Sequence, residues 1–354
     1  MDPLKSSFTI GDVEIGVGRP FIIAELSGNH NQDFELAKRM IFEAANAGVD
    51  AIKLQTYTAD SMTLDVDTAD FLIDDRNSLW HGEKLHQLYQ KASTPYEWHQ
   101  PLFEYANSLG VLAFSSPFDE DAVDFLDALN VPCFKIASFE ITDLPLIARA
   151  ASKKKPLIIS TGMASLAEIE EAVHTARLNG CDELVLLKCT STYPASPENS
   201  NLLTIPHLKE TFSTLVGLSD HTLGIGAAVA SVAFGASVIE KHFVLSREDG
   251  GVDSAFSLEP KEFEALVRET QTAAMAIGKV NYGASKAEAT SLTHRRSIYV
   301  SQDIAKGDNF NANNIRVVRP AFGLPPRYKD TILGKKAKRD IAKGTPLSWA
   351  LVDG

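Results

Sequence analysis

From residue 20 to about residue 276, the chain alternates short β-branched apolar runs with longer stretches in which apolar residues recur every three or four positions. The first pattern predicts buried strands and the second predicts amphipathic helices. Eight strands are expected: Phe21–Ala24, Ala51–Leu54, Val111–Phe114, Cys133–Ile136, Leu157–Ile159, Leu184–Leu187, Leu215–Leu218 and Val238–Ile239. Eight helices are expected between and after them: Phe34–Ala47, Tyr96–Leu109, Ala122–Leu129, Leu144–Ala151, Leu166–Leu178, Pro206–Thr211, Ile225–Phe234 and Lys261–Ala276. This count and size predict an α/β protein built as a (β/α)8 TIM barrel.

Each predicted strand ends in polar or ionisable side chains, which a TIM barrel gathers at one face. They are Glu25, Lys53 with Gln55, Ser115 with Ser116, Lys135 with Ser138 and Glu140, Ser160 with Thr161, Lys188 with Thr190, Ser219 with His221, and Glu240 with His242. One or two such ends would be ordinary solvated strand termini, but eight that converge predict a functional mouth. The lysines at or near strand ends, Lys53, Lys135, Lys188 and Lys241, are expected to form a local anion trap.

The last two predicted strands each lead to a histidine, His221 and His242. Neighbouring strand ends bring these imidazoles together, with the carboxylates of Asp220 and Glu240 beside them. That combination predicts an open divalent-metal site. The alternative is that each histidine makes a local hydrogen bond and binds nothing.

Two long loops are expected at the same face. The loop from Thr56 to about Tyr89 carries several aspartates and aromatic residues, and long loops at this end of a barrel usually cover a substrate. The glycine-rich segment Arg247–Ser254 is either a flexible turn or a lid that closes on a bound anion.

The composition and hydrophobic pattern of the chain change after the barrel, which we expect to occupy residues 1–280. Residues 281–294 are small and polar and predict a linker. Residues 295–354 have short alternating strands and many Lys and Arg residues. They also contain an internal repeat, because the sequence of Asp303–Gly307 recurs as Asp340–Gly344. A compact β-rich module with pseudo-symmetry is expected.

Composition limits the partners and the compartment. A net charge of −12 argues against a nucleic-acid or anionic-membrane surface, because both need a basic face. No apolar run is long enough to span a membrane, and Met1–Ser7 is mostly polar. Three cysteines without Cys-x-x-Cys spacing favour reduced thiols in a cytoplasm.

The strand-end motifs, taken in order, resemble those of the nonulosonic acid synthases, relatives of sialic acid synthase that condense phosphoenolpyruvate with an acetamido sugar. The motifs are Ala24-Glu25 with Asn29-His30-Asn31, Ile52–Thr56, Phe134–Ser138, Ser160–Met163, Cys189-Thr190 with Tyr193-Pro194, Gly217–Thr222 and Glu240–His242. The resemblance covers nearly the whole chain, and the tail, with Arg319-Pro320, resembles the antifreeze-like (SAF) domain of that family.

Within the family, Leu79–Gly82, Thr94–His99, Ser115–Asp119 and Gly250–Ser254 look most like the pseudaminic acid branch. That branch uses 2,4-diacetamido-2,4,6-trideoxy-β-L-altrose, and the legionaminic and N-acetylneuraminic acid synthases are the alternative. Two positions depart from the family pattern. Ser191 stands where Asn often follows Cys-Thr, and Ala321 stands where Gly usually follows Arg-Pro.

The resemblance implies a role for each site residue. Phosphoenolpyruvate is expected on Lys53, Lys135, Ser138, Ser160, Ser191 and Ser219. The sugar is expected against Gln55, Tyr193 and Asp253, with Glu25 or Glu240 as the catalytic proton carrier. Mn²⁺, Co²⁺ or Mg²⁺ is expected on His221 and His242. The family pattern also implies a domain-swapped homodimer in which Arg319 contacts the neighbour's sugar, and the alternative is a module docked on its own barrel.

Three other functions fit parts of the same pattern. They are a metal-dependent aldolase or hydrolase, a Schiff-base aldolase, and a non-catalytic carbohydrate- or ice-binding protein suggested by the tail. The lysine- and serine-rich barrel mouth argues against the last of these, because binding an extended surface needs no such pocket.

Overall fold

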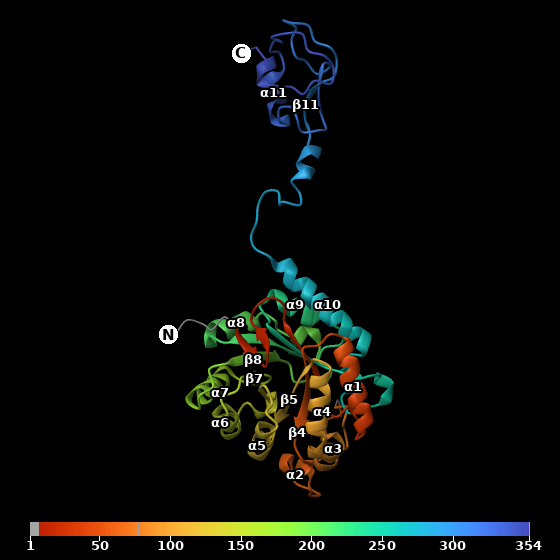
Figure 1. Cartoon of the computed structure of the whole chain (residues 1–354), viewed down its shortest axis with the longest axis vertical. Helices are drawn as coiled ribbons and strands as arrows, with labels where there is room; N and C mark the ends of the chain where they lie inside the picture. Colours follow the sequence, from red (N-terminus) through yellow and green to blue (C-terminus); the bar gives the residue numbers. More distant parts are fainter. Residues whose placement is uncertain (1–6, 77, 354) are drawn as a thin grey trace. The chain divides into compact units, whose positions relative to one another are not determined.

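The computed structural model describes residues 7–76 and 78–353 and divides the chain into two units between Gly278 and Lys279. The first unit is a closed barrel of eight parallel strands, in the order β10-β3-β4-β5-β6-β7-β8-β9 (Figure 1). The strands are β3 (Phe21–Glu25), β4 (Ala51–Thr56), β5 (Leu112–Pro117), β6 (Phe134–Ile136), β7 (Leu157–Ser160), β8 (Leu184–Cys189), β9 (Leu215–Asp220) and β10 (Val238–His242). All eight predicted strands are confirmed, and most extend one to three residues further toward the polar ends.

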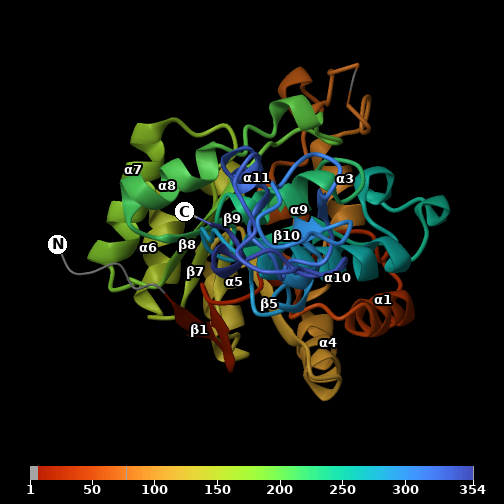
Figure 2. The same ribbon diagram turned by 90° about the horizontal axis from the view of Figure 1, so that it is seen from above.

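Helices surround the strands, with α6, α7 and α8 on one side of the barrel and α1 and α4 on the other (Figure 2). They are α1 (Phe34–Asn46), α4 (Tyr96–Ser108), α5 (Glu120–Ala128), α6 (Leu144–Ser152), α7 (Leu166–Leu178), α8 (Thr204–Phe212), α9 (Gly226–Ala233) and α10 (Pro260–Ile277). Several begin at a side-chain cap, because Asp33, Asp119, Asp143 and Ser165 each accept a hydrogen bond from a backbone N–H of the first turn. The eight predicted helices are confirmed.

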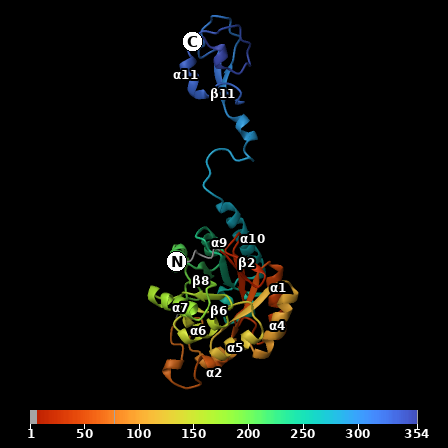
Figure 3. The ribbon, with the colours of Figure 1, turned by 60° about the vertical axis from the view of Figure 1, so that its left-hand side comes forward.

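A hairpin that the sequence pattern did not predict precedes the barrel. Strands β1 (Phe8–Ile10) and β2 (Val13–Ile15) pair antiparallel, and Phe8, Ile10 and Ile15 join the hydrophobic core of the barrel. The hairpin therefore contributes apolar surface to the end of the barrel opposite the polar strand ends. Figure 3 shows β2 and α2 at opposite ends of this unit.

The predicted loop from Thr56 to Tyr89 is partly helical. It contains α2 (Ala59–Met62) and α3 (Leu85–Ala92), joined by a segment in which Leu72 and Lys84 form an antiparallel bridge. The segment expected as a long covering loop therefore contains two short helices that the sequence pattern did not predict. No helix of the described residues is long and apolar enough to cross a membrane.

The second unit has its own core and an internal pairing of its two repeats. Strands β11 (Ser297–Val300) and β12 (Ile315–Val318) are antiparallel, and α11 (Lys329–Ile332) follows them. The two Asp-Ile-Ala-Lys-Gly segments face each other. The Lys343 N–H donates to Asp303 Oδ1 at 2.7 Å, and the Lys306 N–H donates to Asp340 Oδ1 at 2.7 Å. The two repeats are thus related by equivalent hydrogen bonds, in which the aspartate of each repeat accepts from a backbone N–H of the other.

Gly217 allows β9 and β10 to approach closely, which yields a stability prediction. A Cβ added there would collide with the backbone carbonyl of Val238, and backbone cannot move aside as a flexible side chain can. We expect Gly217→Ala to lower the free energy of unfolding of the barrel by about 3 kcal/mol. Denaturant unfolding followed by circular dichroism measures this change.

Gly226→Ala is the matched control. Gly226 opens α9, and an added Cβ there meets no atom of the described residues within 4 Å. Since alanine favours a helix, this variant should be as stable as the parent or slightly more stable. Equal stability of the two variants would contradict the proposed close approach.

Candidate functional site

A cavity of about 310 Å³ lies at the carboxyl ends of the barrel strands. Every strand contributes at least one lining side chain: Glu25 from β3, Lys53 and Gln55 from β4, Ser116 from β5, Lys135 from β6, Ser160 from β7, Cys189 from β8, Ser219 from β9, and Glu240 and His242 from β10. Seven of the eight predicted polar strand ends therefore reach the cavity, whereas β8 contributes Cys189 in place of the predicted Lys188 and Thr190.

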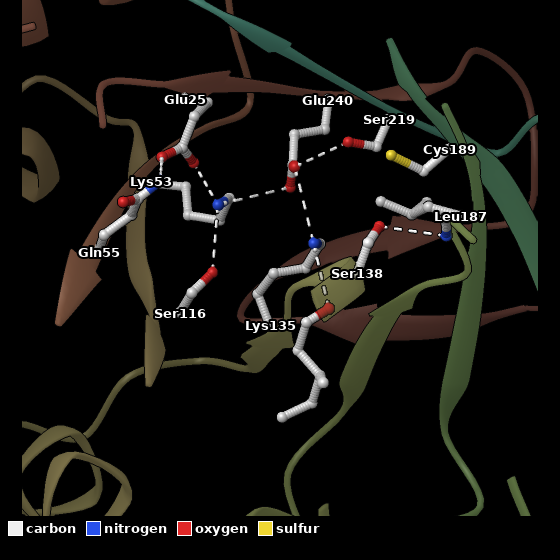
Figure 4. Close-up of polar contacts among 12 residues, drawn as sticks. Glu25, Lys53, Gln55, Ser116, Lys135, Ser138, Leu187, Cys189, Ser219 and Glu240 are labelled. Carbon is white, nitrogen blue, oxygen red and sulfur yellow. Dashed lines mark hydrogen bonds and ion pairs between the residues drawn. The ribbon is translucent and has the colours of Figure 1, made fainter. Parts of the chain in front are cut away.

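The floor of the cavity is a buried cluster of two lysines and two glutamates (Figure 4). Lys53 Nζ forms an ion pair with Glu25 Oε2 and lies 3.9 Å from Glu240 Oε2. Lys135 Nζ lies 3.7 Å from Glu240 Oε1. Two positive and two negative charges can be buried together because each has a partner.

Alternation along the strands decides which ionisable residues reach this floor. Glu240 and His242 are two positions apart on β10 and share the cavity face, whereas Lys241 between them points the other way. Lys241 is buried against Asp220, with Nζ 2.7 Å from Oδ2. Lys241 therefore does not join other lysines at the cavity, and Asp220, which was expected beside the histidines, is paired with Lys241 instead.

Lys188 is excluded from the cavity by the same alternation. It precedes the cavity-lining Cys189 on β8, and its Nζ donates to the Cys189 carbonyl at 2.7 Å and to Thr190 Oγ1 at 3.2 Å. Of the four lysines expected at the strand ends, Lys53 and Lys135 line the cavity. The predicted anion site would thus have two lysines and the surrounding hydroxyl groups as its donors.

The two floor carboxylates have opposite pKa shifts. Burial raises the pKa of Glu25 to about 7, and the repulsion from Glu240 adds to this, against the attraction of Lys53. Burial also disfavours charge on Glu240, but Lys135 and Lys53 together outweigh it and lower its pKa. Glu25 is therefore the carboxyl that can both give and accept a proton near neutral pH.

Serine hydroxyls surround the lysines. Ser116 Oγ lies 3.1 Å from Lys53 Nζ, Ser219 Oγ donates to Glu240 Oε1 at 3.1 Å, and Ser138 Oγ accepts from the Gly162 N–H at 3.1 Å. Ser160 Oγ is buried and has no hydrogen-bond partner within residues 7–76 and 78–353. A buried hydroxyl without a partner in a cavity wall is available to a ligand.

Ser191 lies behind the cavity wall. Its Oγ lies 3.7 Å from Cys189 Sγ, and a Cβ added at Gly162 would collide with it. Ser191 is absent from the cavity lining formed by the described residues, so any effect on a ligand would pass through Cys189 and Gly162.

His221 and His242 both line the cavity, with ring centroids 5.3 Å apart. His221 Nδ1 donates to the Thr190 carbonyl at 3.0 Å, so the neutral form of this ring has its lone pair on Nε2. His242 Nδ1 is buried, has no hydrogen-bond partner in the described part of the chain, and lies 3.5 Å from Asp253 Oδ2. Burial, and after it the nearby cations, lower the pKa of His242 well below its usual value, so its ring is neutral.

Burial disfavours a charge on His221, but its contact with Cys189 outweighs this and raises the pKa of the ring. A divalent ion could be held here by the neutral His242 and by His221 in its neutral form. Between residues 7 and 353, position 77 excepted, no group of three or more His, Cys, Asp or Glu side chains is arranged to hold a metal ion. A catalytic ion here would thus take its remaining ligands from water or substrate.

The remaining predicted site residues are divided between the two units. Gln55 Nε2 donates to Glu25 Oε1 at 3.1 Å, and the Tyr193 ring lies 4.7 Å from the His221 ring, measured between centroids. Asp253 lines the cavity beside His242. Arg319 is exposed and follows β12 in the second unit.

Several lining residues had no role among the predicted site residues. Ser116 and Glu140 were expected at the barrel mouth as polar strand ends, but no substrate contact was assigned to them. Glu140 has a buried Oε2 with no hydrogen-bond partner among the described residues, and burial raises its pKa to about 7. Cys189, with Sγ 3.8 Å from His221 Nδ1, was expected only as a buried thiol. Tyr57, Tyr89 and Phe118 form a cluster of aromatic rings whose contact the sequence gives no means to foresee.

Comparison with known proteins agrees with this geometry. The NeuB family model matches residues 40–282, and the SAF domain model matches residues 295–353. The chain belongs to the NeuB family. It is 46% identical to the pseudaminic acid synthase of Campylobacter jejuni, over 92% of this chain and 95% of that one. It is 37% identical to the N,N'-diacetyllegionaminic acid synthase of Legionella pneumophila, over 94% of each.

The fold of this NeuB-family chain is also that of a solved relative. The crystal structure of N-acetylneuraminic acid synthetase from Leptospira borgpetersenii aligns with a TM-score of 0.72 and 33% identity, covering 82% of this chain and 97% of that one. The TIM barrel, the SAF domain and the family expected from the strand-end motifs are therefore confirmed.

The two lysine environments give a paired prediction about anion binding. Lys135→Met removes a cation from the cavity floor, so we expect kcat/KM for phosphoenolpyruvate to fall on the order of tenfold to a hundredfold. Lys188→Met removes a cation of equal charge that lies outside the cavity lining, and KM for phosphoenolpyruvate should stay near the parent value. Steady-state kinetics at fixed sugar concentration measure both variants. A similar loss of kcat/KM for phosphoenolpyruvate in both variants would favour a diffuse electrostatic effect over a specific contact with Lys135.

Proposed function

We propose that this protein is a pseudaminic acid synthase. It condenses phosphoenolpyruvate with 2,4-diacetamido-2,4,6-trideoxy-β-L-altrose and water, and it releases pseudaminic acid and phosphate by C–O cleavage. The observation that carries the proposal is the cavity floor of a NeuB-family barrel, where two buried lysines and serine hydroxyls lie next to a pair of histidines. The 46% identity to the Campylobacter jejuni synthase supports this branch of the family.

Phosphoenolpyruvate carries a carboxylate and a phosphate and therefore needs several fixed donors. Lys53, Lys135, Ser138, Ser160 and Ser219 supply them, with Ser191 acting from behind the wall. Charge-assisted hydrogen bonds of this kind are the strong ones, and they are stronger in a site from which water is excluded. In the free protein Glu25 and Glu240 neutralise the lysines. A bound anion therefore competes with carboxylates that already hold the cations.

His221 and His242 are the residues that would hold a divalent ion such as Mn²⁺, Co²⁺ or Mg²⁺. Such an ion supplies Lewis-acid polarisation of the sugar aldehyde oxygen, which phosphoenolpyruvate, a weak carbon nucleophile, requires. The hydrogen bond from His221 to the Thr190 carbonyl fixes the tautomer of that ring.

The chain's own residues orient the substrates and move protons. The C3 carbon of phosphoenolpyruvate attacks the aldehyde carbon, whose oxygen takes a proton from a carboxylic acid and becomes a hydroxyl, and C2 becomes oxocarbenium-like. Water adds at C2 and returns a proton to that carboxylate. The C2–O bond to phosphate then breaks, the proton of the C2 hydroxyl leaves with the phosphate, and C2 becomes a carbonyl. Glu25, whose pKa is raised to about 7, is suited to accept and return this proton, whereas Glu240 stays ionised and stabilises the positive centre.

A single assay tests the reaction and its rivals. Phosphoenolpyruvate, Mn²⁺ and the diacetamido sugar are mixed in ¹⁸O-water, and phosphate and sugar acid are read by mass spectrometry. We expect unlabelled phosphate and one ¹⁸O atom in the acid, because the bond that breaks is C–O. EDTA should abolish turnover and added Mn²⁺ should restore it. Activity that survives chelation would support a Schiff-base aldolase, and the absence of phosphate with every acetamido sugar would contradict the proposal.

The sugar distinguishes this function from its nearest alternative. The legionaminic and N-acetylneuraminic acid synthases act on other acetamido sugars. The same assay with a panel that includes N-acetylmannosamine therefore measures the preference directly. Faster turnover with N-acetylmannosamine than with the diacetamido altrose would assign the chain to the alternative branch.

We also propose that the protein is a domain-swapped homodimer in which Arg319 reaches the sugar in the partner's barrel. The domain boundaries in this proposal are 1–280 for the barrel, 281–294 for the linker and 295–354 for the SAF domain. The exposed position of Arg319 beyond β12 and the SAF match over residues 295–353 support it. The free, buried thiols of Cys133, Cys181 and Cys189 support a reducing, cytoplasmic location.

Subunit complementation tests the swapped arrangement. Arg319→Ala leaves the barrel intact, and His221→Ala leaves the SAF domain intact, so each variant alone should be nearly inactive. If Arg319 acts in trans, an equal mixture that has exchanged subunits regains about a quarter of the parental sites, because half the dimers are mixed and each has one complete site. No recovery after exchange would show that Arg319 acts within its own chain or has no role. A variant ending at Thr293 that keeps full turnover would exclude any role for the domain.

A further inference from the structure

One wall of the cavity is apolar and comes from a single segment of the chain. Six side chains define this apolar wall, and all line the cavity: Tyr57, Met62, Ile73, Leu85, Leu88 and Tyr89. None of the six belongs to the hydrophobic core of the barrel among the described residues. Their apolar surface is therefore available to a ligand in the cavity. Side chains packed in the barrel core would not offer such a surface.

Helix α3 turns its apolar face toward the cavity. Leu85, Leu88, Tyr89 and Ala92 occupy positions i, i+3, i+4 and i+7, so they form one apolar stripe. A surface helix normally packs such a stripe on the core. Here all four residues line the cavity, and Gln87 on the opposite face is exposed.

The wall is held over the charged floor by contacts with other loops. Trp80 Nε1 donates to the Val252 carbonyl at 3.1 Å, one residue before Asp253. The Tyr57 ring packs edge-on against Tyr89 and Phe118, with centroid distances of 5.8 and 5.2 Å. The cavity therefore has a floor built for an anion and a wall built for apolar groups.

These two surfaces suit two different substrates. The charged groups of phosphoenolpyruvate bind to the lysines of the floor. The apolar wall is therefore left to contact the sugar. The sugar of the proposed function carries three methyl groups, one on each acetamido group and one at C6. A hydroxyl at C6 would need a hydrogen-bond partner, and the wall offers only the phenol hydroxyls of Tyr57 and Tyr89.

We propose that the apolar wall of residues 57–89 is the specificity element of this enzyme, which selects a hexose with a C6 methyl over the same hexose with a C6 hydroxyl. The inference rests on the proposed function and deepens it. Leu88 and Leu85 of α3 are the determinants that this geometry assigns.

Matched sugars test the assignment. The first is the 2,4-diacetamido-2,4,6-trideoxy hexose, and the second is the 2,4-diacetamido-2,4-dideoxy hexose of the same configuration, which has a hydroxyl at C6. With the parent enzyme, kcat/KM should favour the first by about tenfold to a hundredfold. Leu88→Gln offers the hydroxyl a partner, so this preference should shrink about tenfold, while KM for phosphoenolpyruvate is unchanged. Leu85→Gln is an independent second variant.

Gln87→Ala, on the exposed face of the same helix, is the control and should keep the parental preference. If both leucine variants fold, as judged by circular dichroism, and keep the parental preference, the wall does not select the sugar and the inference is wrong. An equal loss with both sugars would also contradict it, because that outcome indicates a structural role. If the parent enzyme releases no phosphate from either sugar, the proposed function fails and the inference fails with it.

Discussion

The arrangement of the whole site depends on the burial of four charges at the bottom of a barrel. Lys53, Lys135, Glu25 and Glu240 are withdrawn from water, and each charge is tolerable only because an opposite one lies beside it. The neutral cluster is therefore fixed in position before any ligand arrives. An anion that enters therefore finds the cations already in place, although it must compete with the two carboxylates for them.

The same balance explains why the two glutamates differ. Both are fully buried, but Glu240 lies between two lysines, whereas Glu25 pairs with one lysine and also meets the charge of Glu240. The environment pushes their pKa values apart, and that separation is how one site provides both a permanent charge and a proton carrier. His242 beside them remains neutral for a related reason, because its burial next to cations disfavours a further positive charge.

The sequence was sufficient for the barrel because its signals are periodic and repeated. Strand ends such as Lys53-Leu54-Gln55 carry alternation, and several helices begin at a capping residue. It was not sufficient to orient Lys188 and Lys241, because barrel strands are apolar on both faces and the register that turns one residue inward is set by the neighbouring strands. Helix α3 was missed for another reason. It is short and lies within an acidic stretch, and its apolar stripe faces a cavity. The hairpin of Phe8–Ile10 and Val13–Ile15 has strands of three residues, too short for a periodic signal.

The crossed hydrogen bonds of Asp303 and Asp340 have a consequence for how the second unit behaves as a molecule. Each repeat closes the turn of the other, and Ile304 and Ile341 pair between them, so neither half possesses a complete set of contacts. A domain of this size with a core shared between repeats should melt in a single cooperative step. The two repeats visible in the sequence are thus not two independent folding units. If the chain were cut between them, both halves would unfold together.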